Sequence, residues 1–399
     1  MNLAMPSFFL HPSPRTLELV QKPVAYGAWW DGWPGFQQTH WSHLQHALVH
    51  SFASHRWRTS NASTAQACVV ASPVRGRCER WNEICPGKRL IVIAATDADI
   101  TLKLCHTLWS NCAQMVRRDI VRIVGNTPRL RNRTKMPCGP ALLNTLSVPY
   151  LSHCRRINST LFDFERTPRP VRVAMAFAIH GHKGAKNWGV LDWRTELRTA
   201  CSDARRASNE CGWVWPSMGG KNARDAVDLY RRSVFCLQPP GDSFARPGIV
   251  DAVSVGCIPV LFHQAQAELW PWHWDASEAA VTYDWADPSQ RSGEAVMKSL
   301  LALPEQRVQA LQRGLARAAS RLVYRGESGA SASAETEGND AFETLVRGLL
   351  QQERRVPAGR SLEYVPIRPS WAGGNATRGA VAAPLGSVHS IDRSVYAGT

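Results

Sequence analysis

Short apolar runs alternate along this chain with segments whose apolar residues recur at helical spacing. The runs have the pattern of buried strands, and they cover 67–71, 89–95, 120–124, 171–177, 234–237 and 257–262. The helical patterns cover 41–52, 100–113, 192–206, 225–232, 249–255, 300–323 and 340–353. Strands that alternate with helices predict an α/β chain with parallel sheets.

The elements divide into two α/β halves that join near residues 150–170. A chain of 399 residues fits two domains at roughly 100–200 residues each. The expected parts, in chain order, are an irregular segment (1–35), an N-terminal lobe (36–165), a C-terminal lobe (166–325), a flexible linker (326–338), a closing helix (339–354) and a disordered tail (355–399). Open parallel sheets bind ligands at the carboxyl ends of their strands, so we expect the site in a cleft between the halves.

The charge balance favours an anionic partner. The net charge is +15, and 39 of the basic residues are Arg while 8 are Lys. Arginine suits two-pronged contact with phosphate, although a GC-rich genome explains the same bias. The basic residues are dispersed, with no zinc-finger, helix-turn-helix or RNP pattern, so we expect no nucleic-acid partner.

Cysteine usage indicates an oxidising compartment. The chain has 11 cysteines and four Asn-x-Ser/Thr sequons, and no cysteine spacing fits a structural zinc site. Cys201 and Cys211 are the best candidates for a disulfide, whereas Cys236 and Cys257 lie inside apolar runs and are expected as buried thiols. No apolar window reaches the ~18 residues of a membrane span, and the first residues make a poor signal peptide.

The stretch 233–262, SVFCLQPPGDSFARPGIVDAVSVGCIPVLF, carries the most chemistry. It reads as a buried strand, a Pro/Gly loop and a helix with Pro247 in its first turn. The N–H groups that begin such a helix favour an anion, and Arg246 beside them can fork two phosphate oxygens. Asp251 lies one turn further on and can accept hydrogen bonds from ribose or sugar hydroxyls.

Structural interpretations of the same residues are also open. Arg246 could pair with Asp242 or Asp251, and we favour Asp242 and Ser243 as caps of the helix over ligand contacts. Gly256 is better explained as a helix stop than as a contact. The stretch is neither a Walker loop nor GxGxxG, which argues against kinases, ATPases and dehydrogenases.

Ser233–Phe262 resembles the signature of the exostosin-like glycosyltransferases, in particular the plant and algal branch that includes xyloglucan galactosyltransferases. Weaker likenesses extend to both sides, at Trp57–Thr59 with Ala65–Val70, Trp81–Asn82 with Leu90–Asp97, Val148–Tyr150, Phe177–Cys201 and Asp340–Phe342.

The resemblance implies two facing Rossmann-like domains of the GT-B type, with the acceptor on the N-terminal lobe (36–165) and the nucleotide sugar in the C-terminal lobe (166–325). The reaction that it implies is an inverting transfer from a UDP-sugar to a polysaccharide or glycoprotein glycan. It also implies a Golgi-luminal enzyme with a type II membrane anchor, which we expect to be absent from this chain, no required metal or other cofactor, and possible oligomers with related glycosyltransferases. The departures from the family pattern in the first lobe leave a second hypothesis open, a catalytically inactive glycan-binding relative that acts as an assembly partner.

Five residues are the candidate donor contacts. We expect Lys183, Arg194 and Arg246 to bind the diphosphate, with Ser243 beside them in the loop and Asp251 on the sugar or ribose. Ordinary solvated charge is the competing explanation for Lys183 and Arg194.

The base that accepts the proton of the acceptor hydroxyl should come from the first lobe. Asp97 is the first candidate, with His40, His153 and His180 as alternatives. Asp97-Ala98-Asp99 has the form of a metal-binding DxD motif, but we interpret it as surface of the first lobe.

Overall fold

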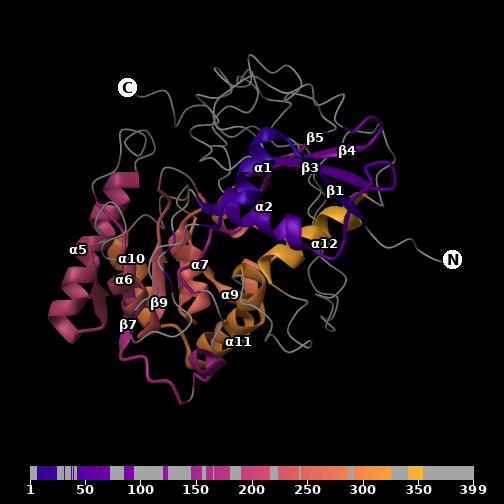
Figure 1. The fold of residues 1–399 in the computed structure, drawn as a ribbon. Helices are drawn as coiled ribbons and strands as arrows, with labels where there is room; N and C mark the ends of the chain where they lie inside the picture. The colour runs from indigo at the N-terminus through magenta and orange to yellow at the C-terminus, as the bar shows by residue number, and fades with distance from the viewer. Residues whose placement is uncertain are drawn as a thin grey trace. The chain divides into compact units, whose positions relative to one another are not determined.

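The fold comprises two parallel sheets with helices packed on them, which confirms the predicted α/β class with two parallel-sheet domains. The computed structural model describes residues 7–24, 31, 37, 39, 43–71, 85–93, 120–124, 145–154, 159–164, 166–179, 190–215, 223–241, 244–284, 287, 292–324 and 340–353. Figure 1 shows these elements along the chain. Within the described ranges, no helix is both long and apolar enough to cross a bilayer.

The first sheet has the strand order β2-β1-β3-β4-β5-β6 in the described residues, and every neighbouring pair is parallel. Its strands are β1 (Phe8–Leu10), β2 (Arg58–Thr59), β3 (Ala67–Ala71), β4 (Arg89–Ile93), β5 (Ile120–Val124) and β6 (Thr145–Ser147). Helices α1 (Pro14–Gln21) and α2 (Leu44–Ser54) precede β2. The 3₁₀ helix η4 (Ser159–Phe162) follows β6.

The prediction of an irregular segment over 1–35 is wrong for residues 8–21. Strand β1 lies between β2 and β3, and Ser13 caps α1 by accepting a hydrogen bond from the Thr16 amide at 3.1 Å. A strand of three residues is too short to show an alternating pattern. The burial of β1 depends on its pairing with strands that lie some fifty residues later in the sequence. The Ser13-Pro14 pair, an N-cap residue followed by proline at the first helical position, could have indicated the start of α1.

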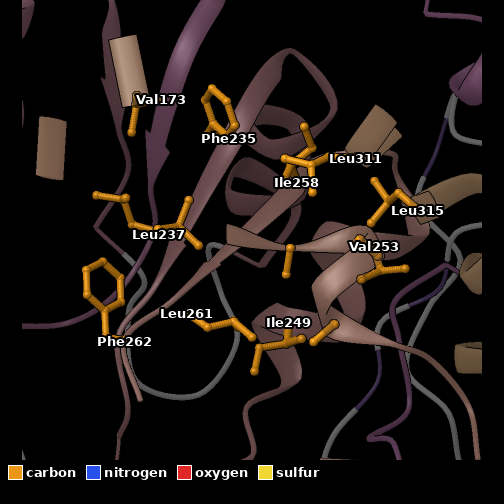
Figure 2. Close-up of a cluster of buried hydrophobic side chains, with 14 of the residues drawn as sticks. Val173, Phe235, Leu237, Ile249, Val253, Ile258, Leu261, Phe262, Leu311 and Leu315 are labelled. Atoms are coloured by element: carbon orange, nitrogen blue, oxygen red, sulfur yellow. The ribbon is translucent and has the colours of Figure 1, made fainter. Parts of the chain in front are cut away.

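The second sheet has the order β11-β10-β9-β7-β8, again parallel throughout. Its strands are β7 (Val171–Met175), β8 (Cys211–Trp213), β9 (Ser233–Gln238), β10 (Ile258–Leu261) and β11 (Val281–Thr282). Its helices are α5 (Val190–Ser208), α6 (Ala223–Arg231), α7 (Pro247–Ser254), α8 (Gln264–Ala267), α9 (Ala276–Ala279), α10 (Gly293–Leu301) and α11 (Glu305–Leu322). Figure 2 shows the core that α7 and α11 form with β9 and β10, including Leu237, Ile249, Ile258 and Leu311.

The long helix predicted over 300–323 is confirmed for Glu305–Leu322, but its predicted start is wrong. Helix α10 ends at Leu301, and α11 begins at Glu305 with Pro304 as its N-cap residue. Proline has no amide hydrogen and disfavours helical backbone in the residue before it, so the amphipathic pattern continues across a break that Pro304 imposes.

Helix α12 (Ala341–Glu353), expected as the closing helix, packs on the core of the first sheet. Phe342 meets Phe52 of α2 edge to face at 4.8 Å between ring centroids. Beside this contact, the Glu343 carboxylate is bonded to His55 at 2.9 Å, Arg56 at 2.8 Å and Arg347 at 2.8 Å. Helix α12, the last described element, therefore completes the core that β1, α1 and α2 begin.

Disulfides differ in part from the prediction. The Cys201–Cys211 bridge is confirmed, and Cys68–Cys85 is an additional bridge. The expectation of buried thiols at Cys236 and Cys257 is wrong, because these two residues form a disulfide with each other. Parallel pairing of β9 with β10 places the two cysteines of separate apolar runs side by side, with Cα atoms 5.9 Å apart.

Candidate functional site

The signature stretch folds as predicted into strand β9, a loop over 239–246 and helix α7. All six residues of β9 are buried, so the loop begins at the end of a core strand. Arg246 has extended backbone (φ −139°, ψ 137°) and is the N-cap residue, and Pro247 opens the helix. Arg246 makes no side-chain cap bond to the helix, and Asp242 and Ser243, which we favoured as caps, lie outside the described residues. The first amides of α7 and the positive end of its dipole face the carboxyl edge of the sheet.

Two of the candidate arginines converge on one aromatic ring at this edge. Phe177 follows β7 and is fully buried. The Arg194 guanidinium of α5 lies 5.6 Å from the centre of the Phe177 ring, and that of Arg246 lies 6.0 Å from it. Helix α5 and the loop before α7 are separate in sequence, and their meeting is the main new information about the site.

Backbone carbonyls hold both guanidiniums in place. Arg194 is 7 % exposed and donates to Ala178 O at 2.7 Å and to Pro240 O at 2.8 Å. Arg246 donates to Pro239 O at 2.5 Å. These carbonyl acceptors orient the two guanidiniums. The two guanidiniums and the start of α7 lie at the carboxyl ends of β7 and β9, and groups of this kind suit a diphosphate.

Asp251 has a different set of partners from those considered from sequence. Its carboxylate is 5 % exposed. Oδ1 accepts from the Ser152 hydroxyl and from the His153 amide, both at 2.9 Å, and Oδ2 lies 2.9 Å from His153 Nδ1. The carboxylate thus joins α7 to the segment after β6, and its proposed contact with a sugar or ribose hydroxyl stays a prediction.

His153 is an imidazole held against a carboxylate. Burial by itself lowers the pKa of His153, but the charge of Asp251 and the hydrogen bond to it outweigh burial, and the pKa is raised above 6.5. An imidazole fixed at Nδ1 by a carboxylate has a defined ring orientation. Of the histidines named as alternative bases, His153 is the one that the described residues include.

Several candidates lie outside the described residues. They are the donor contacts Lys183 and Ser243, the first-choice base Asp97 with its neighbour Asp99, and the alternative bases His40 and His180. Their assigned roles stay predictions.

Two buried polar residues beside the loop were missed from sequence. Gln238 ends β9, and its Nε2 donates to the Tyr230 hydroxyl of α6 at 3.0 Å. Both side chains are buried, and burial is the largest cause of a raised Tyr230 pKa. A Cβ at Gly248 would approach Gln238 Oε1 to 2.7 Å, so a larger residue at the second position of α7 would displace the Gln238 side chain. A glutamine at the end of an apolar strand, here Gln238, could have indicated a buried hydrogen bond.

Comparison with known proteins places this region in context. Residues 137–299 match the family model described as the Exostosin GT47 domain. Residues 137–299 contain Arg194, Arg246 and Asp251, so the resemblance to the exostosin-like glycosyltransferases is confirmed over the candidate site.

The curated relatives are plant proteins. The chain is 27% identical over 218 residues to "Probable xyloglucan galactosyltransferase GT15" of Arabidopsis thaliana, covering 52% of this chain and 44% of that protein. It is 28% identical over 133 residues to "Xyloglucan galactosyltransferase MUR3" (33% and 21%) and 31% identical over 152 residues to "Xyloglucan-specific galacturonosyltransferase 1" (36% and 22%) of the same plant. The chain therefore spans less than half the length of each of these relatives.

Solved structures give weaker likenesses. A chain of the GtfA/B complex matches with a TM-score of 0.40 at 12% identity. The match covers 84% of this protein and 66% of the GtfA/B chain. A UDP-forming α,α-trehalose-phosphate synthase from Burkholderia xenovorans has a TM-score of 0.39 at 10% identity and covers 79% and 77%.

Proposed function

We propose that this protein is an inverting glycosyltransferase that transfers a sugar from a UDP-sugar to a polysaccharide. The convergence of Arg194 and Arg246 on Phe177, next to the first amides of α7, is the observation that carries the proposal. It lies inside the residues that match the exostosin domain. The catalytically inactive glycan-binding relative is the second candidate, and turnover separates the two.

The donor arrangement follows from charge. In the proposed reaction the acceptor oxygen forms a bond to the anomeric carbon on the face opposite the leaving group. The bond from that carbon to the diphosphate oxygen breaks, and its electron pair leaves with UDP. Negative charge therefore grows on the diphosphate, where the two guanidiniums and the start of α7 would stabilise it. Lys183 is the further cation proposed for this position.

The acceptor hydroxyl must lose a proton as it attacks, so the reaction needs a base on the acceptor side. We retain Asp97 as the first candidate. His153 is the alternative base whose surroundings the structure describes. Asp251 holds its Nδ1 and raises its pKa above 6.5.

The names of the relatives suggest the acceptor. Three are described as acting on xyloglucan, so we propose a xyloglucan-type polysaccharide as the first acceptor to test. The sugar that is transferred is left to a donor panel, because two relatives are named for galactose and one for galacturonic acid.

A secretory-pathway lumen, in particular the Golgi, is the proposed location. Three disulfides within the described residues fit an oxidising compartment. Metal-independent activity and association with related glycosyltransferases are part of the same proposal.

The test is thermal stabilisation of the purified protein by UDP, UDP-sugars and GDP-sugars, first without metal and then with manganese. We expect a shift with UDP species in the metal-free buffer. Arg246→Ala should weaken UDP binding at least tenfold, because a charge-assisted contact to phosphate contributes about 1.5–3 kcal/mol. Arg205→Ala, an exposed change on α5, is the matched control and should leave UDP binding unchanged.

Each outcome decides between the candidates. UDP binding followed by sugar transfer to xyloglucan oligosaccharides supports the enzyme. UDP binding without turnover of any donor supports the inactive relative. Unchanged UDP affinity in Arg246→Ala would overturn the assignment of the phosphate site.

A further inference from the structure

A buried glutamine ties the loop over 239–246 to the ends of two strands. Gln266 lies in α8, directly after β10, and is fully buried. Its Nε2 donates to Gln238 O at 2.9 Å and to Phe244 O at 3.3 Å, and its Oε1 accepts from the Phe262 amide at 2.9 Å. One side chain therefore bonds to the end of β9, to the loop and to the residue after β10.

A second contact from the same short helix holds the same loop residue. The His263 ring lies 4.4 Å from the Phe244 ring, with 36° between their planes. His263 Nδ1 accepts from the Ala265 amide at 2.9 Å and caps α8, so the ring is fixed in place before it meets Phe244. Phe244 is 3 % exposed, and Arg246 follows two residues later.

We propose that Gln266 is a positioning residue for the phosphate site. It holds the backbone at Phe244. Two peptide bonds separate Phe244 from Arg246, so this contact sets the direction in which Arg246 and the first amides of α7 point. This inference rests on the proposed function, since it assigns Gln266 to the binding of the donor diphosphate.

The chemistry of the amide explains why glutamine stands at this position. The three backbone groups comprise two acceptors and one donor, and a carboxamide supplies two N–H donors and one carbonyl acceptor in a single group. Loss of the side chain would leave two buried carbonyls and an amide without these partners, and the loop would have to shift to find others. A loop that is ordered before its ligand arrives binds more tightly, because less conformational entropy is lost on binding.

The test compares Gln266→Met with Gln312→Met in the whole protein. Gln312 is a second buried glutamine of the same lobe, on α11, so its substitution controls for loss of a buried amide. We would measure the dissociation constant of UDP by calorimetry, and amide hydrogen exchange in peptides that cover 239–246. We expect UDP binding at least tenfold weaker and faster loop exchange in Gln266→Met, and binding within twofold of the wild type in Gln312→Met.

A second variant addresses a failure of Gln266→Met to fold. His263→Asn keeps an oxygen that can cap α8 and removes the ring from Phe244, so it should weaken UDP binding about threefold or more. If the wild-type protein does not bind UDP, the proposed function fails, and the exchange data still judge the role of Gln266. Wild-type exchange at 239–246 together with UDP affinity within twofold of the wild type in both variants would overturn the inference.

Discussion

At the scale of single residues, the most informative contact is the pair His153 and Asp251. The carboxylate comes from α7 of the second lobe, and the imidazole comes from the segment after β6 of the first sheet. Ser152 adds a hydroxyl to the same carboxylate at 2.9 Å. Buried ion pairs contribute little when both partners are intact, but loss of one partner leaves an uncompensated charge.

The pH dependence of stability follows from the direction of the His153 shift. Asp251 raises the pKa of His153 in the folded protein above 6.5, against the effect of burial. The stability from this pair is therefore fully present below pH 6.5 and is lost as the pH rises through the folded value. We expect His153→Leu to cost about 3 kcal/mol of unfolding free energy near pH 5.5–6, and less toward pH 8. Urea unfolding at a series of pH values measures this.

Ser152→Ala is the control for this prediction. It removes a hydrogen bond to the same carboxylate but no titrating group, so its cost of about 1 kcal/mol should hardly change with pH. A flat pH profile for His153→Leu would show that the pair does not titrate as described.

At the scale of elements, the sequence pattern predicted those strands and helices that carry their own apolar periodicity. Strand β9, helix α7 and the glycine stop at Gly256, which has φ +77°, agree with the pattern. Strands β1 and β8 have three residues each, and their burial depends on neighbouring strands, so no local pattern could reveal them. The candidate site was predictable in its loop and helix, whereas the meeting of Arg194 with Arg246 required the tertiary fold.

The anchoring of α12 gives a prediction for Glu343. Burial alone would raise the pKa of this carboxyl, but hydrogen bonds from His55 and Arg347 and the charge of Arg56 lower it. We expect Glu343→Gln to destabilise the protein by about 2–3 kcal/mol at pH 7, because three basic groups lose their common partner. The wild-type advantage should be present above the unfolded pKa of 4.5 and disappear as the pH falls through the lowered folded value.

Denaturant unfolding compares this variant with Glu278→Gln. Glu278 pairs with Arg317, but both side chains are more than half exposed, so this change should cost less than about 1 kcal/mol. Equal losses in the two variants would mean that the buried position of Glu343 does not matter.

At the scale of the whole molecule, a disulfide links the two ends of the signature stretch. The Cys236–Cys257 bridge spans 21 residues and encloses the loop over 239–246 together with α7. We expect Cys236→Ala with Cys257→Ala to cost about 3 kcal/mol, through the entropy that the bridge removes from the unfolded chain. Peptide mapping without reductant should show the linkage directly. Recovery of both cysteines as free thiols would support the interpretation made from sequence.

The place of α12 also has a consequence for how the protein is made. The hydrogen bond between His55 and Glu343 joins residues 288 positions apart. At about 5–20 residues per second, a ribosome needs roughly 15 to 60 s to synthesise the chain between them. During that interval the apolar surface around Phe8 and Phe52 lacks the helix that covers it, so the nascent first lobe is a natural client for chaperones. We expect a message cut short before the codons for α12 to yield a product that quality control degrades, even though it carries the proposed phosphate site.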